Sequence, residues 1–113
     1  MNFEMFWDIL KNELGKEKKF KTLVRKNEFT AKFQYNKNRE AHIIIIVNSE
    51  RNVERREFEG VWDNSKACLR KTRFENIKEL ESYTRQDGKL GKSTHVSYIA
   101  SLIDHIVKDE NMV

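Results

Sequence analysis

The sequence predicts an α+β fold, in which an N-terminal helix precedes a three- or four-stranded, mainly antiparallel meander sheet and two or three further helices pack on that sheet. The central observation is the run Ala-His-Ile-Ile-Ile-Ile-Val at residues 41–47, which has strand length and β-branched side chains that favour a pleated backbone. Residues 29–35 alternate apolar and polar side chains, the period of a half-buried strand. Segments near both ends of the chain instead carry apolar residues every three or four positions, as amphipathic helices do.

The first predicted helix covers residues 2–14. Asn2 is a suitable N-cap, and Gly15 is a suitable residue just beyond the helix C-terminus. The apolar stripe that is expected to pack on the rest of the fold consists of Phe3, Phe6, Trp7, Leu10 and Leu14.

Three strands are predicted next, at residues 20–24, 29–35 and 41–47, and the short connections between them indicate an antiparallel meander. Such a meander leaves strand 41–47 at an edge, where an uncharged apolar strand is an aggregation risk. We therefore expect this strand to be paired. Its partner is either a strand at residues 69–74 of the same chain, reached through a helical crossover and able to run parallel to it, or the same strand of a second subunit in a homodimer.

The middle of the chain is predicted to continue with a turn and a helix. Residues 48–52 have turn composition, and residues 53–66 have a helical pattern with Phe58, Val61 and Trp62 on the inner face. This helix is the element that would return the chain to a fourth strand.

The last third of the chain ends in a well-defined helix. Residues 76–83 have a weak helical pattern and residues 86–92 a loop composition. Ser93 or Thr94 is expected to cap the final helix, and His95 and His105 are expected on its exposed side. Its apolar face is formed by Val96, Ile99, Leu102, Ile103, Ile106 and Val107.

Length and composition limit the class of protein. The chain of 113 residues is predicted to be a single domain, 1–113. It has one cysteine and no apolar stretch of about 20 residues, so we expect a soluble protein of the reducing cytoplasm that does not interact with a membrane. Abundant Lys, Asn, Glu and Ile without proline is typical of AT-rich coding sequence, including mobile elements.

No enzyme, cofactor or metal site is predicted. Residues 88–94, Gly-Lys-Leu-Gly-Lys-Ser-Thr, match the end of a P-loop, but the first glycine of that motif would fall at Gln86 and no buried strand precedes the segment. Cys68, at the end of an apolar helix face, is expected to be a small core residue rather than a nucleophile. The three histidines are not at metal-ligand spacing.

Positive charge is concentrated in two segments. Residues 16–39 hold nine Lys or Arg against two Glu, and residues 66–92 hold eight Lys or Arg against four acidic residues, whereas the whole chain has a net charge of only +4. A basic hairpin face can track the phosphates of nucleic acid or another polyanion, and no motif for sequence-specific readout is present. We therefore expect a non-catalytic binding protein. The residues expected to contact the anion are Lys19, Lys21, Arg25, Lys26, Lys32, Lys37, Arg39, Arg70, Lys71 and Lys92.

The alternative function is that of a dimeric interaction protein or a small-ligand-binding protein. In that case Trp7, Phe33, Phe58 and Trp62 would line a cavity between the sheet and the helices. A continuous basic face would favour the first function, and a large apolar pocket would favour the second.

Overall fold

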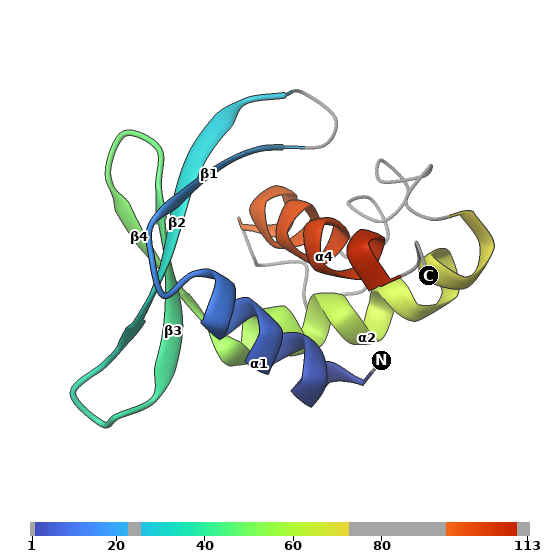
Figure 1. The fold of residues 1–113 in the computed structure, drawn as a ribbon, viewed down its shortest axis with the longest axis horizontal. Coiled ribbons are helices and arrows are strands. Elements are labelled where there is room, and N and C mark those ends of the chain that lie inside the picture. Colours follow the sequence, from blue (N-terminus) through green and yellow to red (C-terminus); the bar gives the residue numbers. More distant parts are fainter. Residues whose placement is uncertain (1, 23–25, 73–94, 111–113) are drawn as a thin grey trace.

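The computed structural model describes residues 2–22, 26–72 and 95–110, and it confirms the predicted α+β architecture. The described helices all lie on one side of a four-stranded sheet, which curves so that its first hairpin bends toward the last helix (Figure 1). In chain order the elements are α1 (Phe3–Glu13), β1 (Lys18–Lys21), β2 (Glu28–Tyr35), β3 (Ala41–Ile46), β4 (Glu50–Glu54), α2 (Arg55–Thr72) and α4 (Val96–Glu110).

The sheet is an antiparallel meander with the strand order β1-β2-β3-β4. Its register aligns the apolar positions of neighbouring strands, because Phe29 lies opposite Phe20 and Ala31 lies opposite Ile45. Side chains alternate faces along a strand, so these residues share the inner face that packs on the helices. Strand β1 begins at Lys18, two residues before the predicted start, and β2 matches its prediction closely.

Strand β3 is paired on both sides, as expected, but its second partner is not the one predicted. Residues 50–54, which were expected to be mostly turn, form β4, and every strand pair is antiparallel. The strand predicted at residues 69–74 is wrong for residues 69–72, because α2 continues to Thr72, and residues 73 and 74 lie outside the described residues. Edge pairing of residues 41–47 with a second copy finds no support, since β2 and β4 already pair with both edges of β3 (Ala41–Ile46).

Local signals explain where two of the helices begin. The Asn2 side chain accepts a hydrogen bond of 2.9 Å from the Met5 amide, which confirms the predicted N-cap of α1. Helix α2 begins at Arg55, two residues later than predicted. The Glu57 carboxylate accepts a hydrogen bond of 2.8 Å from the Glu54 amide, the backward contact of a capping box. That contact allows the preceding residues to remain in β4.

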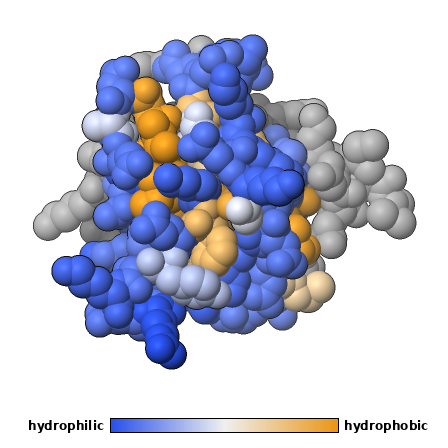
Figure 2. Space-filling model, turned by 60° about the vertical axis from the view of Figure 1, so that its left-hand side comes forward, coloured by the Kyte–Doolittle hydropathy of each residue, from blue (hydrophilic) through white to orange (hydrophobic). Residues whose placement is uncertain are grey.

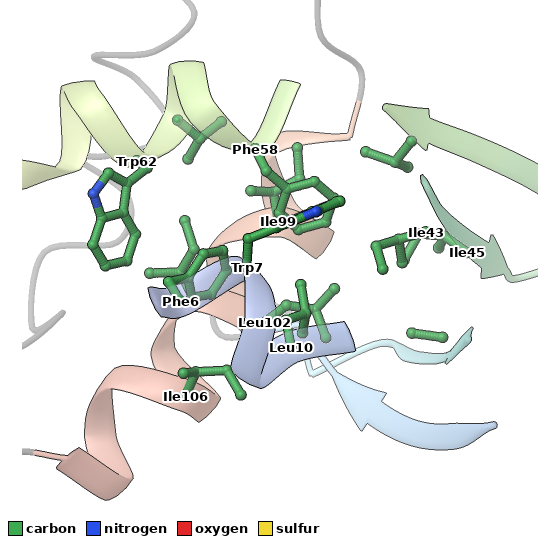
Figure 3. Packing of buried hydrophobic residues seen from close by; sticks show 14 of the residues in the cluster. Phe6, Trp7, Leu10, Ile43, Ile45, Phe58, Trp62, Ile99, Leu102 and Ile106 are labelled. Atoms are coloured by element: carbon green, nitrogen blue, oxygen red, sulfur yellow. The ribbon is translucent and has the colours of Figure 1, made fainter. Parts of the chain in front are cut away.

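The core is built from the aromatic stripe of α1, the inner faces of α2 and α4, and β3. In Figure 3 the rings of α1 and α2 point toward one another. The Phe6 and Trp62 rings stack with centroids 4.9 Å apart, and the Trp7 and Phe58 rings meet edge to face at 5.2 Å. Fully burying one such side chain contributes about 1.5–3 kcal/mol. The α4 residues predicted to face the core are buried, apart from Val107, which is partly buried against it.

Polar contacts between described residues fasten α4, and His95 just before it, to neighbouring elements. His95 hydrogen-bonds Glu57 of α2 at 3.0 Å, and His105 hydrogen-bonds Glu13 of α1. The Ser101 hydroxyl donates to the Lys21 carbonyl oxygen at 2.7 Å. The prediction that both histidines lie on an exposed face is therefore wrong, because carboxylates on two other helices draw them into partly buried pairs.

Several predictions concern the segments outside the described residues. These are the weak helix at 76–83, the loop at 86–92, the P-loop-like residues 88–94 with the capping candidates Ser93 and Thr94, and the end of the strand predicted at 20–24. Among the helices that are described, none has both the length and the apolar character needed to cross a membrane.

Candidate functional site

The outer face of the sheet, which points away from the helices, carries the lysines of the predicted basic hairpin. The register places Lys19 opposite Thr30 and Lys21 opposite Glu28. These residues alternate with the inner-facing pair Phe20 and Phe29, so their side chains are on the outer face. Strand β1 thus contributes two exposed lysines to one edge of this face.

Charge changes sign across the outer face. One row of aligned residues runs from Lys19 through Thr30 and Ile46 to Glu50, so it begins with a cation on β1 and ends with an anion on β4. On β4, Glu54 is also on this face, by alternation with the inward-facing Val53. Figure 2 shows this side of the molecule as a polar surface cut by a narrow apolar strip. The outer face is therefore not continuously basic, and the strand lysines on it that lack an ion pair with a described residue, Lys19 and Lys21, lie at the β1 edge.

The middle of the outer face is closed by the side chains of the strands themselves. Ile44 is only 3% exposed, although the described helices lie on the other side of the sheet (Figure 1). Its neighbours in the register are Lys32 and Asn52, and Lys32 reaches over to Glu50, with 3.8 Å between the ammonium nitrogen and the carboxylate oxygen. The aliphatic part of a lysine can cover apolar surface while its charge stays in water. The aliphatic chain of Lys32 therefore lies next to Ile44, and its ammonium group pairs with Glu50.

Most of the described cations around β1 make no ion pair with a described carboxylate. Lys18 pairs with Glu13 at 3.5 Å, the one described ion pair made by this strand. By contrast, four exposed lysines in or next to the β1–β2 hairpin make no ion pair with a described residue. We call these residues the β1 lysine row: Lys16, Lys19, Lys21 and Lys26.

The hairpin turn holds the last member of the row in a defined place. Lys26 has a positive φ of 57°, a left-handed conformation that is uncommon for a residue with a side chain. The Lys26 amide donates to the Thr22 carbonyl oxygen at 3.1 Å, and the Asn27 amide donates to the Thr22 hydroxyl oxygen at 3.0 Å. These bonds offset the conformational cost and fix the backbone that carries Lys26.

The other predicted anion-binding residues are not brought to this edge. Lys37 and Arg39 lie at the opposite end of the sheet, in the β2–β3 turn, and both are exposed without a described ion pair. Arg70 and Lys71 belong to the last turns of α2 rather than to a strand of the sheet. Arg25 and Lys92 lie outside the described residues.

An open pocket of about 490 Å³ lies beside the β2–β3 turn, between that turn, α1 and the start of α2. Its charges are nearly balanced. Arg55 pairs with Glu4 and, at 3.0 Å, with Glu59, and Arg56 pairs with Glu54 at 2.6 Å. The pocket is lined by Trp7, Lys11, Tyr35, Asn36, Arg39, Glu40, Ala41, His42, Glu54, Arg55, Arg56 and Glu59.

The aromatic residues proposed for an internal cavity mostly fill the core instead. Phe58 and Trp62 are buried in the core cluster, and Phe33 is partly buried against it. Trp7 is also buried, yet it is the one of the four that contributes to the pocket wall. The structure therefore places a polar, open pocket next to α1, where the sequence had suggested an apolar one beneath the sheet.

The Glu13 carboxylate, which links α1 to His105 of α4, has a lowered pKa. Burial on its own raises the pKa of Glu13, but the hydrogen bond with His105 and the positive charges of His105 and Lys18 outweigh it and lower the pKa. Within the described part of the chain, no cluster of His, Cys, Asp or Glu is suited to hold a metal ion. The Glu13 group is thus a structural link between helices.

Two features of the candidate site were not recognised in the sequence. Lys16 belongs to the basic segment 16–39 but was not among the residues expected to contact the anion, although the structure places it just before β1, and Tyr35 was expected only to be a strand residue. The exposure of Tyr35 could have been expected from its position, because it is the last residue of β2 before the turn.

Comparison of the chain with profiles of protein families, with curated proteins and with solved structures finds no match.

Proposed function

We propose that the chain is a non-catalytic binding protein that holds a polyanion, such as the phosphate backbone of nucleic acid, on the β1 lysine row. The observation that supports this function is the exposure of four lysines along one edge of the sheet that make no ion pair with a described residue, although Glu28 lies opposite Lys21. An exposed cation near other cations is electrostatically costly until an anion arrives, so such a row favours binding of a multiply charged partner.

The expected mode of binding is independent of nucleotide sequence. Contacts between lysine and phosphate release condensed counterions, and each contact lowers the logarithm of the affinity by about 0.9 per tenfold rise in salt on duplex DNA. Four lysines engaged together would give a slope of roughly −3.6 by the same rule. The described surface offers short edge strands rather than a recognition helix, which supports contact with the backbone rather than with base edges.

The test is a salt series on a matched pair of variants. Lys21→Glu reverses a charge within the β1 lysine row, and Arg51→Glu makes the same charge change on β4, at the opposite edge of the sheet. Affinity for a mixed-sequence nucleic acid is measured by fluorescence anisotropy. We expect Lys21→Glu to weaken binding several-fold and to flatten the salt dependence, and Arg51→Glu to have a small effect.

Circular dichroism serves as the control for folding, because exposed charges contribute little to stability. Equal losses in the two variants would show that only the net charge matters, and unchanged affinity in Lys21→Glu would reject the site.

The second function, binding of a small ligand, is supported by the open pocket with Trp7 and Tyr35 in its wall. Binding there would depend weakly on salt, because Lys11, Arg55 and Arg56 in the pocket wall are already paired with carboxylates. The same salt series therefore separates the two functions.

A further inference from the structure

We propose that the pocket beside the β2–β3 turn accepts one unpaired nucleobase, stacked on the ring of Tyr35, so that the polyanion is single-stranded nucleic acid. This inference rests on the proposed function, since it names the partner of the same protein. The pocket would be a second point of contact, away from the β1 lysine row, and would make the protein prefer single-stranded to duplex nucleic acid.

Tyr35 has the properties of a stacking platform. It is 58% exposed, which is unusual for an aromatic residue at the end of a core strand, and it forms part of the pocket wall. Its ring meets the ring of Phe33 edge to face, with centroids 5.0 Å apart and planes at 78°. Phe33 is itself partly buried against the core, so it restrains Tyr35 from one side. A restrained, exposed ring loses little conformational freedom when a base stacks on it.

The turn that borders the pocket is rigid. The Asn36 side-chain oxygen accepts hydrogen bonds from the amides of Asn38 at 2.9 Å and Glu40 at 3.0 Å. The Asn36 amide donates to the Glu40 carbonyl oxygen at 2.9 Å, and Arg39 has a positive φ of 59°. The network fixes the backbone of Arg39 and Glu40, both of which line the pocket.

The charges in the pocket suit a neutral ring better than a phosphate. Lys11 is 3.4 Å from Asp8, and the two arginines at the start of α2 are paired with glutamates, so these cations are already neutralised. Arg39 has no described ion pair and is available for the phosphate next to the bound base. The Glu40 carboxylate can accept a hydrogen bond from an exocyclic amino group of a base.

The pocket and the β1 lysine row are close enough for one strand to reach both. Lys19 and Lys21 are on the outer face, whereas Tyr35 shares the inner face with Phe33, so a bound strand has to pass around the margin of the sheet. Lys16 lies near this path, because the carbonyl oxygen of Leu14, two residues before it, accepts a hydrogen bond of 3.0 Å from the Phe33 amide, two residues before Tyr35. A duplex cannot make this contact without cost, because its bases are paired and stacked, whereas those of a single strand can splay onto an aromatic side chain.

The experiment measures binding of a fluorescent single strand of about 12 nucleotides, within the range of site sizes known for small single-strand-binding folds, and of the matching duplex. We expect the wild type to prefer the single strand. Tyr35→Ala is expected to weaken single-strand binding by roughly 10- to 100-fold, the usual effect of losing one base–aromatic stack. Tyr35→Phe keeps the ring and is expected to retain the affinity.

Met5→Ala is the matched control, because Met5 is an exposed apolar residue of α1 that does not line the pocket, and it is expected to bind as the wild type does. The inference is overturned if Tyr35→Ala binds the single strand as tightly as the wild type, if Tyr35→Phe loses as much affinity as Tyr35→Ala, or if duplex and single strand bind equally. In each of these cases a loss in Lys21→Glu would still uphold the proposed function. Absence of binding to either form by the wild type would overturn both.

Discussion

Ile43 and Ile45 on the inner face of the sheet are fully buried against the helices, whereas Ile44, between them on the outer face, is 3% exposed beneath the side chains of its own sheet. The three residues are consecutive isoleucines whose side chains point to alternate faces of the sheet, so their surroundings differ. The inner pair contacts a close-packed core, and Ile44 is flanked in the register by Lys32 and Asn52. Burial alone therefore does not reveal which side of a strand faces the core.

The difference has a functional consequence. The side chains of the inner face are close-packed against the helices, so a change in their volume alters the stability of the fold. The outer face is covered by long polar side chains that can move, so its edges remain available to a partner. The β1 lysine row lies at one of these edges, while Glu50 and Glu54 mark the other. The comparison of the two faces leads to the following tests.

Truncation on the inner face should have the largest effect. Ile43→Ala removes part of a fully buried side chain from the centre of the core, next to Phe33 in the register. We expect a loss of about 3–4 kcal/mol in the free energy of unfolding, since the surrounding helices cannot collapse fully into the cavity. Chemical denaturation gives this value directly. A loss below about 1 kcal/mol would show that the inner face is loosely packed.

Truncation on the outer face should cost less. Ile44→Ala makes the same chemical change one residue along the strand, and we expect a loss of about 1–2 kcal/mol, because Lys32 and Asn52 are free to close over the gap. The same denaturation experiment compares the two variants. Equal losses for Ile43→Ala and Ile44→Ala would contradict the distinction between the two faces.

The carboxylate of Glu13, which pairs with His105 and Lys18 on the helix side of the sheet, provides a third test with a smaller expected effect. The lowered pKa of Glu13 means that its carboxylate stabilises the folded state above its ordinary value of 4.5, and that this contribution disappears as the pH falls through the lowered value. We expect Glu13→Gln to cost about 1 kcal/mol or less at pH 7. At a pH below the folded-state pKa, where wild-type Glu13 is protonated, the two proteins should be equally stable. Urea denaturation at both pH values checks this, and a difference that persists in acid would exclude the charge of Glu13 as its cause.

The smallest effect is expected for the exposed pair on the outer face. Lys32→Met removes the 3.8 Å contact with Glu50 but keeps an unbranched apolar chain of similar length over Ile44. We expect a change within about 0.5 kcal/mol, which is typical of surface ion pairs. A larger loss in urea denaturation would mean that the ammonium group, rather than the aliphatic chain, closes the outer face.

Strong periodic patterns made much of the fold predictable. The stripe from Phe3 to Leu14, the alternation in β2 and the apolar face of α4 each identify an element without reference to the rest of the chain. They were assigned correctly because local preference and tertiary packing agree there.

Strand β4 was missed because it carries almost no such pattern. Val53 is its one buried residue, and the neighbouring Glu, Arg and Asn side chains are typical of turns or of protected edge strands. Pairing with β3 overrides their weak strand preference.

The site was only partly predictable. Exposed lysines in a hairpin can be recognised in a sequence, but their freedom from ion pairs depends on distant residues. Glu13 neutralises Lys18 and Glu50 neutralises Lys32, and neither pairing follows from spacing along the chain. The contacts of His95 and His105 with glutamates 38 and 92 positions away have the same long-range origin.

The most direct test of the central claim is a nuclear magnetic resonance titration of the labelled protein with a short single strand of nucleic acid. Amide and lysine side-chain shifts report on both edges of the sheet in one experiment. The structure predicts the largest and earliest changes at Lys16, Lys19, Lys21 and Lys26, with further changes at Tyr35 and small ones along β4. Changes centred on Glu50–Glu54, or none around β1 at saturating ligand, would contradict the assignment of the binding edge.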